Sequence, residues 1–573
     1  MKSKMKKLVS LVLAMAMVLT MSLAVYADEE ESGSTETTTY TITINNTTAG
    51  HTYEAYQIFD GDLSSKKDED DVTTYTLSNI VWGSGVDYTN TVGEGDDAKT
   101  LLEAVKAISV GETTPFADCE DAAAVAEILK NYSDNPDAVN AFAEAVAPYL
   151  VSKNAVTSTC NEDESENVEN YTISITDPGY YLVKDQDESL LSETNDAYTS
   201  YILEVVADAE VEPKSSVPSM TKKVQDANDS TDATDTVNAW QDSADYDIGD
   251  DVPFQLTATM PSTLSSYDTY SITFHDTMDG GLSFNSDSVE VYVGDTKVSS
   301  SCYTVKTTGL SDTTCTFEIA FDDVRALVDE SSNSIEVSAN TQIVVTYTAK
   351  LTGEAVVIGN SGNWNTAYLE YSNNPYTEGT GKTPTDTVVV LTYDLTINKV
   401  NGDEEPLSGA EFSLTKYNKV SGTWETVTLT KSEDGTSFTA EGLDDGVYKL
   451  SETKTPTGYN SIDDIYFIVS AEHTTTIEEK NSAPLTSLTV TQATWDGESA
   501  TAAAVGEADA TATFNTTLTP AEDATLIATS IKNQSGSILP STGGIGTTIF
   551  YIVGAILVLG AGVILVTRRR TAR

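Results

Sequence analysis

Short segments with apolar or β-branched residues at every second position recur along most of the chain. Examples are TYTITINN at 39–46, DVPFQLTATMP at 251–261 and YDLTINKV at 393–400. A period of two puts these residues on one face of an extended strand, and the Gly, Asn and Asp residues between such segments favour turns. The pattern therefore predicts a mainly β chain of short strands, arranged as immunoglobulin-like β-sandwiches.

One region departs from this period of two. The segments at 101–110, 121–130 and 137–151 carry Ala, Leu and Val at the spacing of amphipathic helices. They lie between segments that alternate like strands. We therefore expect a first domain, 38–212, that is mostly β with inserted helices.

A linker rich in Pro and Ser, VEPKSSVPSM at 211–220, closes that domain. The strand pattern then resumes, and we expect a middle β-sandwich over 213–390 and a C-terminal β-sandwich over 391–536. A chain of 573 residues has room for three such domains, because domains typically span about 50–200 residues.

Both ends of the chain carry processing signals. Residues 1–27 combine a basic start, an apolar run and small residues before a cleavage point, which is typical of a secretory signal peptide; a retained membrane helix is the alternative. Residues 539–573 begin with LPSTGG, continue through an apolar stretch at 546–567 and end on arginines. This order predicts a transmembrane helix with a cytoplasmic basic tail, and by itself it also fits a plain single-span membrane protein.

Composition argues against several classes of function. The formal net charge is −58 at pH 7, so nucleic acid is not an expected partner, and the scattered acidic residues are expected to form a solvated surface. The sequence has no P-loop, dinucleotide fingerprint or G-x-S-x-G motif, and His51, His275 and His473 have none of the spacings of a zinc site. We therefore expect no enzymatic activity, no cofactor and no metal.

The four cysteines are an even number in a chain expected to be exported, which permits two disulfides. Proximity in the sequence favours Cys119 with Cys160 and Cys302 with Cys315. Both pairs are hypotheses that a thiol count on unreduced, unfolded protein would test.

Two lysines fall at strand positions that face a core. Alternation puts Lys222 on the same face as Met220, and Lys399 on the same face as Ile397. A buried ammonium is costly, so such a lysine should be neutral, paired or chemically altered. The opposite register, or a strand that ends early, would leave both lysines in solvent, and spacing alone does not decide between these possibilities.

Several motifs resemble those of Gram-positive surface proteins. YKLSETKTPTGY at 448–459 is very close to the E-box of Gram-positive pilins and of collagen-adhesin B-type domains, and EPLSGAEFSL at 405–414 is similar to the strand that follows their reactive lysine. LPSTG before an apolar span and a basic tail matches the sorting signal that sortases read. The chain thus resembles the major, or shaft, pilins of sortase-assembled pili. By this resemblance, the residues of two internal Lys–Asn isopeptide bonds are Lys222, Asp276 and Asn365 in the middle domain and Lys399, Glu452 and Asn533 in the C-terminal domain.

The resemblance implies a chemistry that suits these residue types. In a core poor in water the lysine loses its charge and becomes a nucleophile, while a protonated carboxylic acid polarises the Asn carbonyl and ammonia leaves. The fold holds the partners together, so no external enzyme is needed. The first domain departs from the pattern, because 39–46 contains no lysine and GYYLVKD at 179–185 lacks the E-box glutamate. We expect no isopeptide bond there.

The resemblance also implies a covalent polymer. A sortase would cleave between Thr542 and Gly543, hold the Thr542 carbonyl as a thioester and pass it to an amine. VEPK at 211–214 resembles the pilin motif of major pilins, with Glu212 in place of its usual aromatic residue, so the implied acceptor is Lys214 of another copy. The residues of the sorting signal are Leu539, Pro540, Ser541, Thr542 and Gly543.

The implied partners are identical subunits joined head to tail, a pilin-specific class C sortase, a housekeeping sortase, tip and basal pilins, and the peptidoglycan of a Gram-positive cell wall. An adhesin or basal pilin that is anchored singly is the alternative, and it would need the sorting signal but no acceptor lysine. In that case Lys214 would be an exposed linker residue without a role.

Overall fold

The computed structural model separates the chain into two compact units. Strands account for 47% of it and helices for 13%, which confirms the mainly β fold class. The structure describes residues 39–571 except 68–72, 94, 96–97, 112, 133–134, 164, 191–193, 206–207, 214, 227–239, 354, 377, 504–510, 515–525 and 537–544. Unit 1 comprises 1–224, 251–350 and 364–388, and unit 2 comprises 225–250, 351–363 and 389–573.

The N-terminal part of unit 1 contains two sheets. One has the strand order β5-β6-β1-β9, and the other has the order β3-β2-β7-β8 with β4 beside β2. Alternate residues of the facing strands form a buried cluster, in which Ile42 and Ile173 join Tyr53 and Val183. The strands are β1 (Tyr40–Ile44), β2 (Tyr53–Lys67), β3 (Thr73–Trp82), β4 (Val156–Thr157), β5 (Thr159–Glu162), β6 (Val168–Ile175), β7 (Gly179–Asp185), β8 (Ser200–Val205) and β9 (Ala209–Val211).

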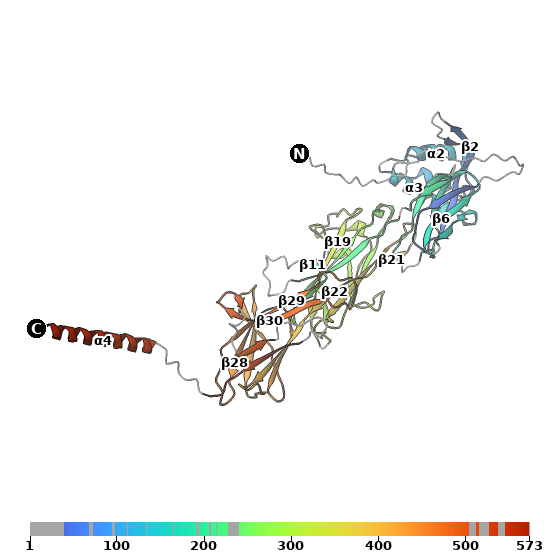
Figure 1. Ribbon diagram of the computed structural model, residues 1–573. Coiled ribbons are helices and arrows are strands. Elements are labelled where there is room, and N and C mark those ends of the chain that lie inside the picture. The colour runs from blue at the N-terminus through green and yellow to red at the C-terminus, as the bar shows by residue number, and fades with distance from the viewer. Residues whose placement is uncertain are drawn as a thin grey trace. The chain divides into compact units, whose positions relative to one another are not determined.

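The expected helices lie in this same part of unit 1. They are α1 (Leu101–Lys106), α2 (Ala122–Asn131) and α3 (Pro136–Val146), and Figure 1 shows α2 and α3 beside β2. Their apolar faces bury Leu129 and Phe142 in one cluster with Phe59 of β2. Asp121 caps α2 by accepting a hydrogen bond from the Ala124 backbone N–H, which stabilises the first turn of that helix.

The remaining part of unit 1 contains two further sheets, and both contribute residues to the middle lysine site described below. One runs β10-β13-β19-β15-β16, and the other contains β22-β20-β14-β18-β17 with β21 beside β20. Inward residues alternate along β13 and β19, where Phe254 is opposite Tyr347. The strands are β10 (Ser219–Gln225), β13 (Asp251–Thr259), β14 (Ile272–Met278), β15 (Leu282–Val293), β16 (Thr296–Lys297), β17 (Thr304–Lys306), β18 (Phe317–Phe321), β19 (Gln342–Leu351), β20 (Asn363–Ser372), β21 (Thr380–Lys382) and β22 (Asp386–Leu391).

Unit 2 is built on two sheets with the orders β26-β27-β23-β33-β32 and β25-β24-β28-β29-β30-β31. The first strand β23 pairs in parallel with the last long strand β33, and Lys399 is opposite Ile531. The strands are β11 (Trp240–Gln241), β12 (Ser243–Asp245), β23 (Tyr393–Val400), β24 (Glu411–Asn418), β25 (Thr423–Val427), β26 (Thr430–Lys431), β27 (Ser437–Leu443), β28 (Gly446–Lys454), β29 (Ile465–His473), β30 (Leu485–Trp495), β31 (Ala500–Ala502), β32 (Ala512–Phe514) and β33 (Leu526–Lys532).

Residues 225–250 belong to unit 2 although they precede β13 in the sequence. Within unit 2, β12 pairs in parallel with residues 389–391 of β22. The division into two units does not follow the expected domain boundaries at 212 and 390, which stay predictions.

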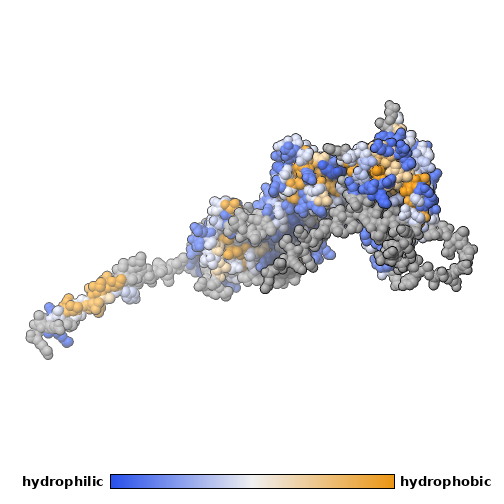
Figure 2. Space-filling model, turned by 90° about the horizontal axis from the view of Figure 1, so that it is seen from above, coloured by the Kyte–Doolittle hydropathy of each residue, from blue (hydrophilic) through white to orange (hydrophobic). Residues whose placement is uncertain are grey.

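The C-terminal helix α4 (Ile545–Thr571) follows the sorting signal and confirms the apolar helix expected there. It is long and apolar enough to cross a membrane, and its described apolar side chains, such as Tyr551 and Leu557, are exposed. They form the hydrophobic rod in Figure 2. The expected signal peptide, Lys214 and the residues Leu539–Gly543 lie outside the described residues.

Candidate functional site

The middle lysine site joins residues from two sheets of unit 1. Lys222 of β10 donates from Nζ to Asp276 Oδ2 at 2.6 Å and to the Tyr347 hydroxyl at 2.7 Å. The hydroxyl donates to the same Asp276 oxygen at 2.6 Å, and Asn365 Nδ2 donates to the hydroxyl at 3.1 Å. Lys222, Asp276 and Asn365 are fully buried. The structure therefore brings the expected residues of this site together.

Strand register explains this grouping. On β14 and β20, Asp276 is opposite Ala367 and Met278 is opposite Asn365, so Asp276 and Asn365 are diagonal neighbours on one face. Lys222 and Tyr347 reach the same place from β10 and β19 of the other sheet. Residues far apart in the sequence thus meet because the two sheets face each other.

Burial shifts the acid–base properties of this site. Loss of hydration lowers the pKa of Lys222 although Asp276 opposes the shift, and the same loss raises the pKa of Asp276 although Lys222 opposes it. Both shifts favour the neutral pair of amine and carboxylic acid. A neutral amine has a free lone pair, which makes it a nucleophile.

The C-terminal lysine site lies in unit 2. Lys399 of β23 is fully buried, and its Nζ donates to the Ile531 carbonyl at 2.8 Å and to the Val400 carbonyl at 3.0 Å. The buried Asn533 side chain donates from Nδ2 to Glu452 Oε2 at 3.2 Å and to the Asn460 carbonyl at 2.6 Å. Burial lowers the pKa of Lys399 to about 8. The strand register therefore points Lys399 into the core and not into solvent.

The two sites share a pattern of unpaired oxygens. Asp276 Oδ1 and Asn365 Oδ1 have no hydrogen-bond donor in the first site, and Glu452 Oε1 and Asn533 Oδ1 have none in the second. Unpaired buried acceptors are uncommon, and each calls for a physical explanation, such as a bound water, an ion or a chemical role. A proton on the acid would turn one oxygen of each pair into a donor.

Sequence reasoning missed Tyr347, which contacts all three expected residues of the middle site. The alternation of TQIVVTYTAKL does point its side chain inward with Ile343 and Val345. An inward tyrosine is common in a β-sandwich core, so the pattern gave no signal of a special role.

The four cysteines are free thiols in the structure. Cys119 is buried in the helical cluster, whereas Cys160 is exposed on β5. Cys302 Sγ accepts a hydrogen bond from the Val328 N–H at 3.4 Å. Cys315 is buried. Both suggested pairs stay hypotheses, and the thiol count remains their test.

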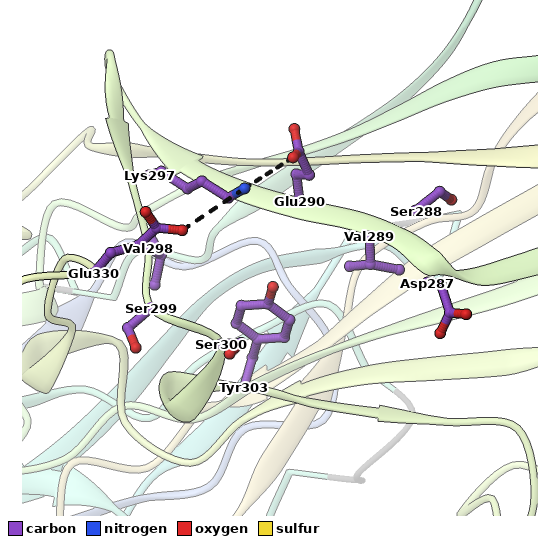
Figure 3. A pocket seen from close by; sticks show the side chains of 10 residues that line it. All are labelled: Asp287, Ser288, Val289, Glu290, Lys297, Val298, Ser299, Ser300, Tyr303 and Glu330. Carbon is purple, nitrogen blue, oxygen red and sulfur yellow. Dashed lines mark hydrogen bonds and ion pairs between the residues drawn. The ribbon is translucent and has the colours of Figure 1, made fainter.

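A polar pocket of unit 1 offers a contrast to the two buried sites (Figure 3). Lys297 Nζ lies 2.8 Å from Glu290 Oε1 and 3.8 Å from Glu330 Oε1 in this pocket, and all three side chains are partly exposed. Hydration and ion pairing keep such a lysine charged. The pairing with Glu290 raises its pKa, the opposite direction to Lys222 and Lys399.

Comparison with known proteins gives matches both to family models and to a related protein. Residues 393–483 match the family SpaA, a prealbumin-like fold domain, and residues 531–572 match the LPXTG cell wall anchor motif. The chain is 27% identical over 407 residues to the trypsin-resistant surface T6 protein of Streptococcus pyogenes serotype M6, covering 63% of this chain and 70% of that protein.

Solved structures of similar fold include two pilins. The T6 backbone pilin of S. pyogenes serotype M6 has a TM-score of 0.45 and 19% identity, covering 87% of this chain and 99% of that one. The full-length major pilin SpaD of Corynebacterium diphtheriae has a TM-score of 0.42 and 17% identity, covering 88% and 100%.

The anchor motif and the surface relative define a class, the cell wall-anchored surface proteins of Gram-positive bacteria, to which this chain is similar. More particularly, it is homologous to the T6 protein and carries a SpaA-type prealbumin-like domain before the anchor.

Proposed function

We propose that this chain is the repeating shaft subunit of a pilus, joined by a sortase through Thr542 to Lys214 of the next copy. The sorting signal supplies an acyl donor and the VEPK segment supplies an amine acceptor in the same chain. A subunit with one donor and one acceptor at different places forms a heterologous, open-ended polymer. This coexistence of donor and acceptor is the observation that carries the proposal.

The transfer has two balanced steps. A sortase cysteine attacks the Thr542 carbonyl, the peptide bond to Gly543 breaks, and the new amine of Gly543 leaves with the C-terminal helix. The Lys214 amine of another copy then attacks the thioester, an amide forms, and the cysteine thiol is released. The last copy, or a basal pilin, passes the fibre to peptidoglycan.

Within each subunit, two isopeptide bonds are proposed, Lys222 to Asn365 and Lys399 to Asn533. The lysine Nζ attacks the Asn Cγ, the bond from Cγ to Nδ2 breaks, and Nδ2 leaves as ammonia with the proton that the amine gives up. Asp276 and Glu452 act as the proton carriers and polarise the carbonyls. The unpaired oxygens on each acid and each Asn support these roles.

The three expected domains, 38–212, 213–390 and 391–536, remain part of this proposal. The Lys214 linker would fall between the first two of them, and each isopeptide bond would lie inside one of the others. Pulling force would then follow covalent bonds through the cross-linked domains.

Replacement of Lys214 by Ala tests the polymer. Cell wall extracts of the variant should lose the high-molecular-weight ladder on a denaturing gel and keep a wall-bound monomer. Lys297→Ala, which removes an exposed lysine of unit 1, is the matched control and should keep the ladder. A ladder that persists in the Lys214 variant would refute the acceptor and favour a singly anchored adhesin or basal pilin.

A further inference from the structure

Three side chains of unit 2 form a cluster outside both lysine sites. Asp226, Asp245 and His473 each offer one ligand atom, and these atoms lie within 4.8 Å of one another. Asp226 and Asp245 are 5% and 2% exposed, and the His473 side chain is 7% exposed. The cluster joins residues 225–250 to the end of β29.

The hydrogen bonds of His473 decide where its ring protons lie. Ser243 Oγ is 2.5 Å from the Thr474 carbonyl oxygen and 2.6 Å from His473 Nδ1. A serine hydroxyl has one proton, and a carbonyl oxygen can only accept, so Ser243 donates to Thr474. His473 Nδ1–H must then donate to Ser243. In the neutral ring this leaves Nε2 with a free lone pair, the form that binds metals.

Nε2 of His473 faces the two carboxylates, but at distances that are too long for a direct hydrogen bond. Asp226 Oδ2 is 3.6 Å away and Asp245 Oδ1 is 4.0 Å away, whereas a charged N–H···O bond measures about 2.7–2.9 Å. Ligands about 2.1 Å from a tetrahedral zinc ion lie roughly 3.4 Å from each other. The spacing is therefore closer to that of ligands around an ion than to that of a hydrogen-bonded pair.

One oxygen of the cluster also lacks a partner. Within the described part of the chain, Asp226 Oδ1 is buried and accepts no hydrogen bond, while Oδ2 of the same carboxylate accepts a long one, 3.4 Å from Gln241 Nε2. A buried carboxylate with an unpaired oxygen is costly unless a cation or a proton compensates it.

Two other clusters of the same chain show what compensated carboxylates look like. His51 of unit 1 lies 2.6 Å from Asp185 through Nδ1 and 2.6 Å from Asp196 through Nε2, so both of its ring nitrogens are directly hydrogen-bonded to carboxylates. Asp247 and Asp444 of unit 2 share the ammonium of Lys416. Among the described residues, Asp226 forms no ion pair with a lysine, and His473 Nε2 lies 3.6 Å from its Oδ2.

We propose that Asp226, Asp245 and His473 bind a divalent transition-metal ion of the zinc type. An imidazole nitrogen with two carboxylate oxygens suits Zn²⁺ better than Ca²⁺, which takes six to eight oxygen ligands. Three protein ligands leave a fourth position for water. The ion would pin residues 225–250 to the prealbumin-like domain. This proposal departs from our expectation of no metal, which rested on spacing in the sequence alone.

The test is a Zn²⁺ titration by calorimetry of the full-length chain, purified in detergent without a histidine tag and stripped with EDTA. We expect one ion per chain with a dissociation constant in the micromolar range or below. His473→Gln and Asp226→Asn should each weaken binding at least tenfold, since even loss of an outer partner of a ligand costs that much. Asp163→Asn, which changes an exposed turn, should bind like the wild type.

A second readout does not depend on the variants' folding. Co²⁺ added to the stripped wild-type chain should give visible d–d absorption bands that Zn²⁺ abolishes at one equivalent. Absence of saturable Zn²⁺ binding below about 100 μM, or equal binding by wild type and the folded His473 variant, would overturn the proposal.

Discussion

Lys222 Nζ and Asp276 Oδ2 lie 2.6 Å apart, and neither side chain is exposed to solvent. A buried pair of this kind stabilises a fold little, because desolvation offsets most of the attraction. Burial also drives the lysine towards the amine and the aspartate towards the acid. The relationship therefore makes more physical sense as a reactive pair than as a stabilising ion pair.

The first prediction concerns mass. The mature wild-type chain should be lighter than its sequence by two ammonia masses, because each proposed bond expels one. Asp276→Ala should remove one of the two losses, since the middle site would lack its proton carrier, and Glu452→Ala should remove the other. Intact-mass spectrometry measures this directly. Lys454→Ala, an exposed neighbour of Glu452 on β28, should keep both losses, and a full theoretical mass for the wild type would contradict the prediction.

The second prediction concerns stability. The Lys399–Asn533 bond would close a loop of about 130 residues, which by analogy with disulfides stabilises a domain by roughly 4–5 kcal/mol. Glu452→Ala should therefore lower the free energy of unfolding of unit 2 by an amount of this order in guanidinium denaturation. Unfolding of unit 1 in the same chain serves as the internal reference. An unchanged transition for unit 2, in protein whose mass shows the bond is missing, would refute the stabilising role of the bond.

The third prediction concerns Tyr347. Its hydroxyl accepts from Lys222 and Asn365 and donates to Asp276, so Tyr347→Phe leaves buried donors unpaired at a cost of about 1–3 kcal/mol. We expect a smaller fraction of molecules that have lost ammonia at the middle site, measured on peptides that span it. Tyr292→Phe removes a partly buried hydroxyl bonded to Glu290, outside the middle site, and should have no effect. Complete cross-linking in the Tyr347 variant would show that the hydroxyl does not position the reactants.

The fourth prediction concerns pH. Burial by itself lowers the pKa of His51, but the hydrogen bonds that its ring N–H groups donate to Asp185 and Asp196 outweigh it and raise the pKa to about 9. A raised histidine pKa stabilises the fold fully below the unfolded value of about 6.5, and the contribution disappears as pH rises through about 9. Unit 1 should therefore lose up to about 3 kcal/mol between these values.

Urea denaturation of unit 1 at pH 6.5 and at pH 9.5 measures this loss. His51→Gln should be less stable at pH 6.5 and should show a flatter dependence on pH. A wild-type midpoint that is the same at both pH values would contradict a charged His51.

Much of the secondary structure and the anchor could be predicted from the sequence, because residue periodicity and short motifs depend only on neighbouring residues. Alternation along YDLTINKV placed Lys399 inside, and β23 has that register over its whole length. The helices of unit 1 followed from their apolar spacing. The sorting motif, the span and the basic tail adjoin one another in the sequence, so the anchor needed no tertiary information, and the anchor and the apolar helix are confirmed.

Tertiary structure decided which distant residues meet. Tyr347 joins the middle site because β19 lies in the sheet opposite β14 and β20, and no spacing along the chain reveals that. Asp226 and His473 come together because β12 pairs with residues 389–391 and brings the segment before β13 into unit 2. Sequence by itself determined the strand faces, the inserted helices and the anchor, since period and motif are properties of neighbours. The geometries of the two lysine sites and of the cluster around Asp226 depend on pairings between strands that are far apart in the chain, and only the folded sheets define those pairings.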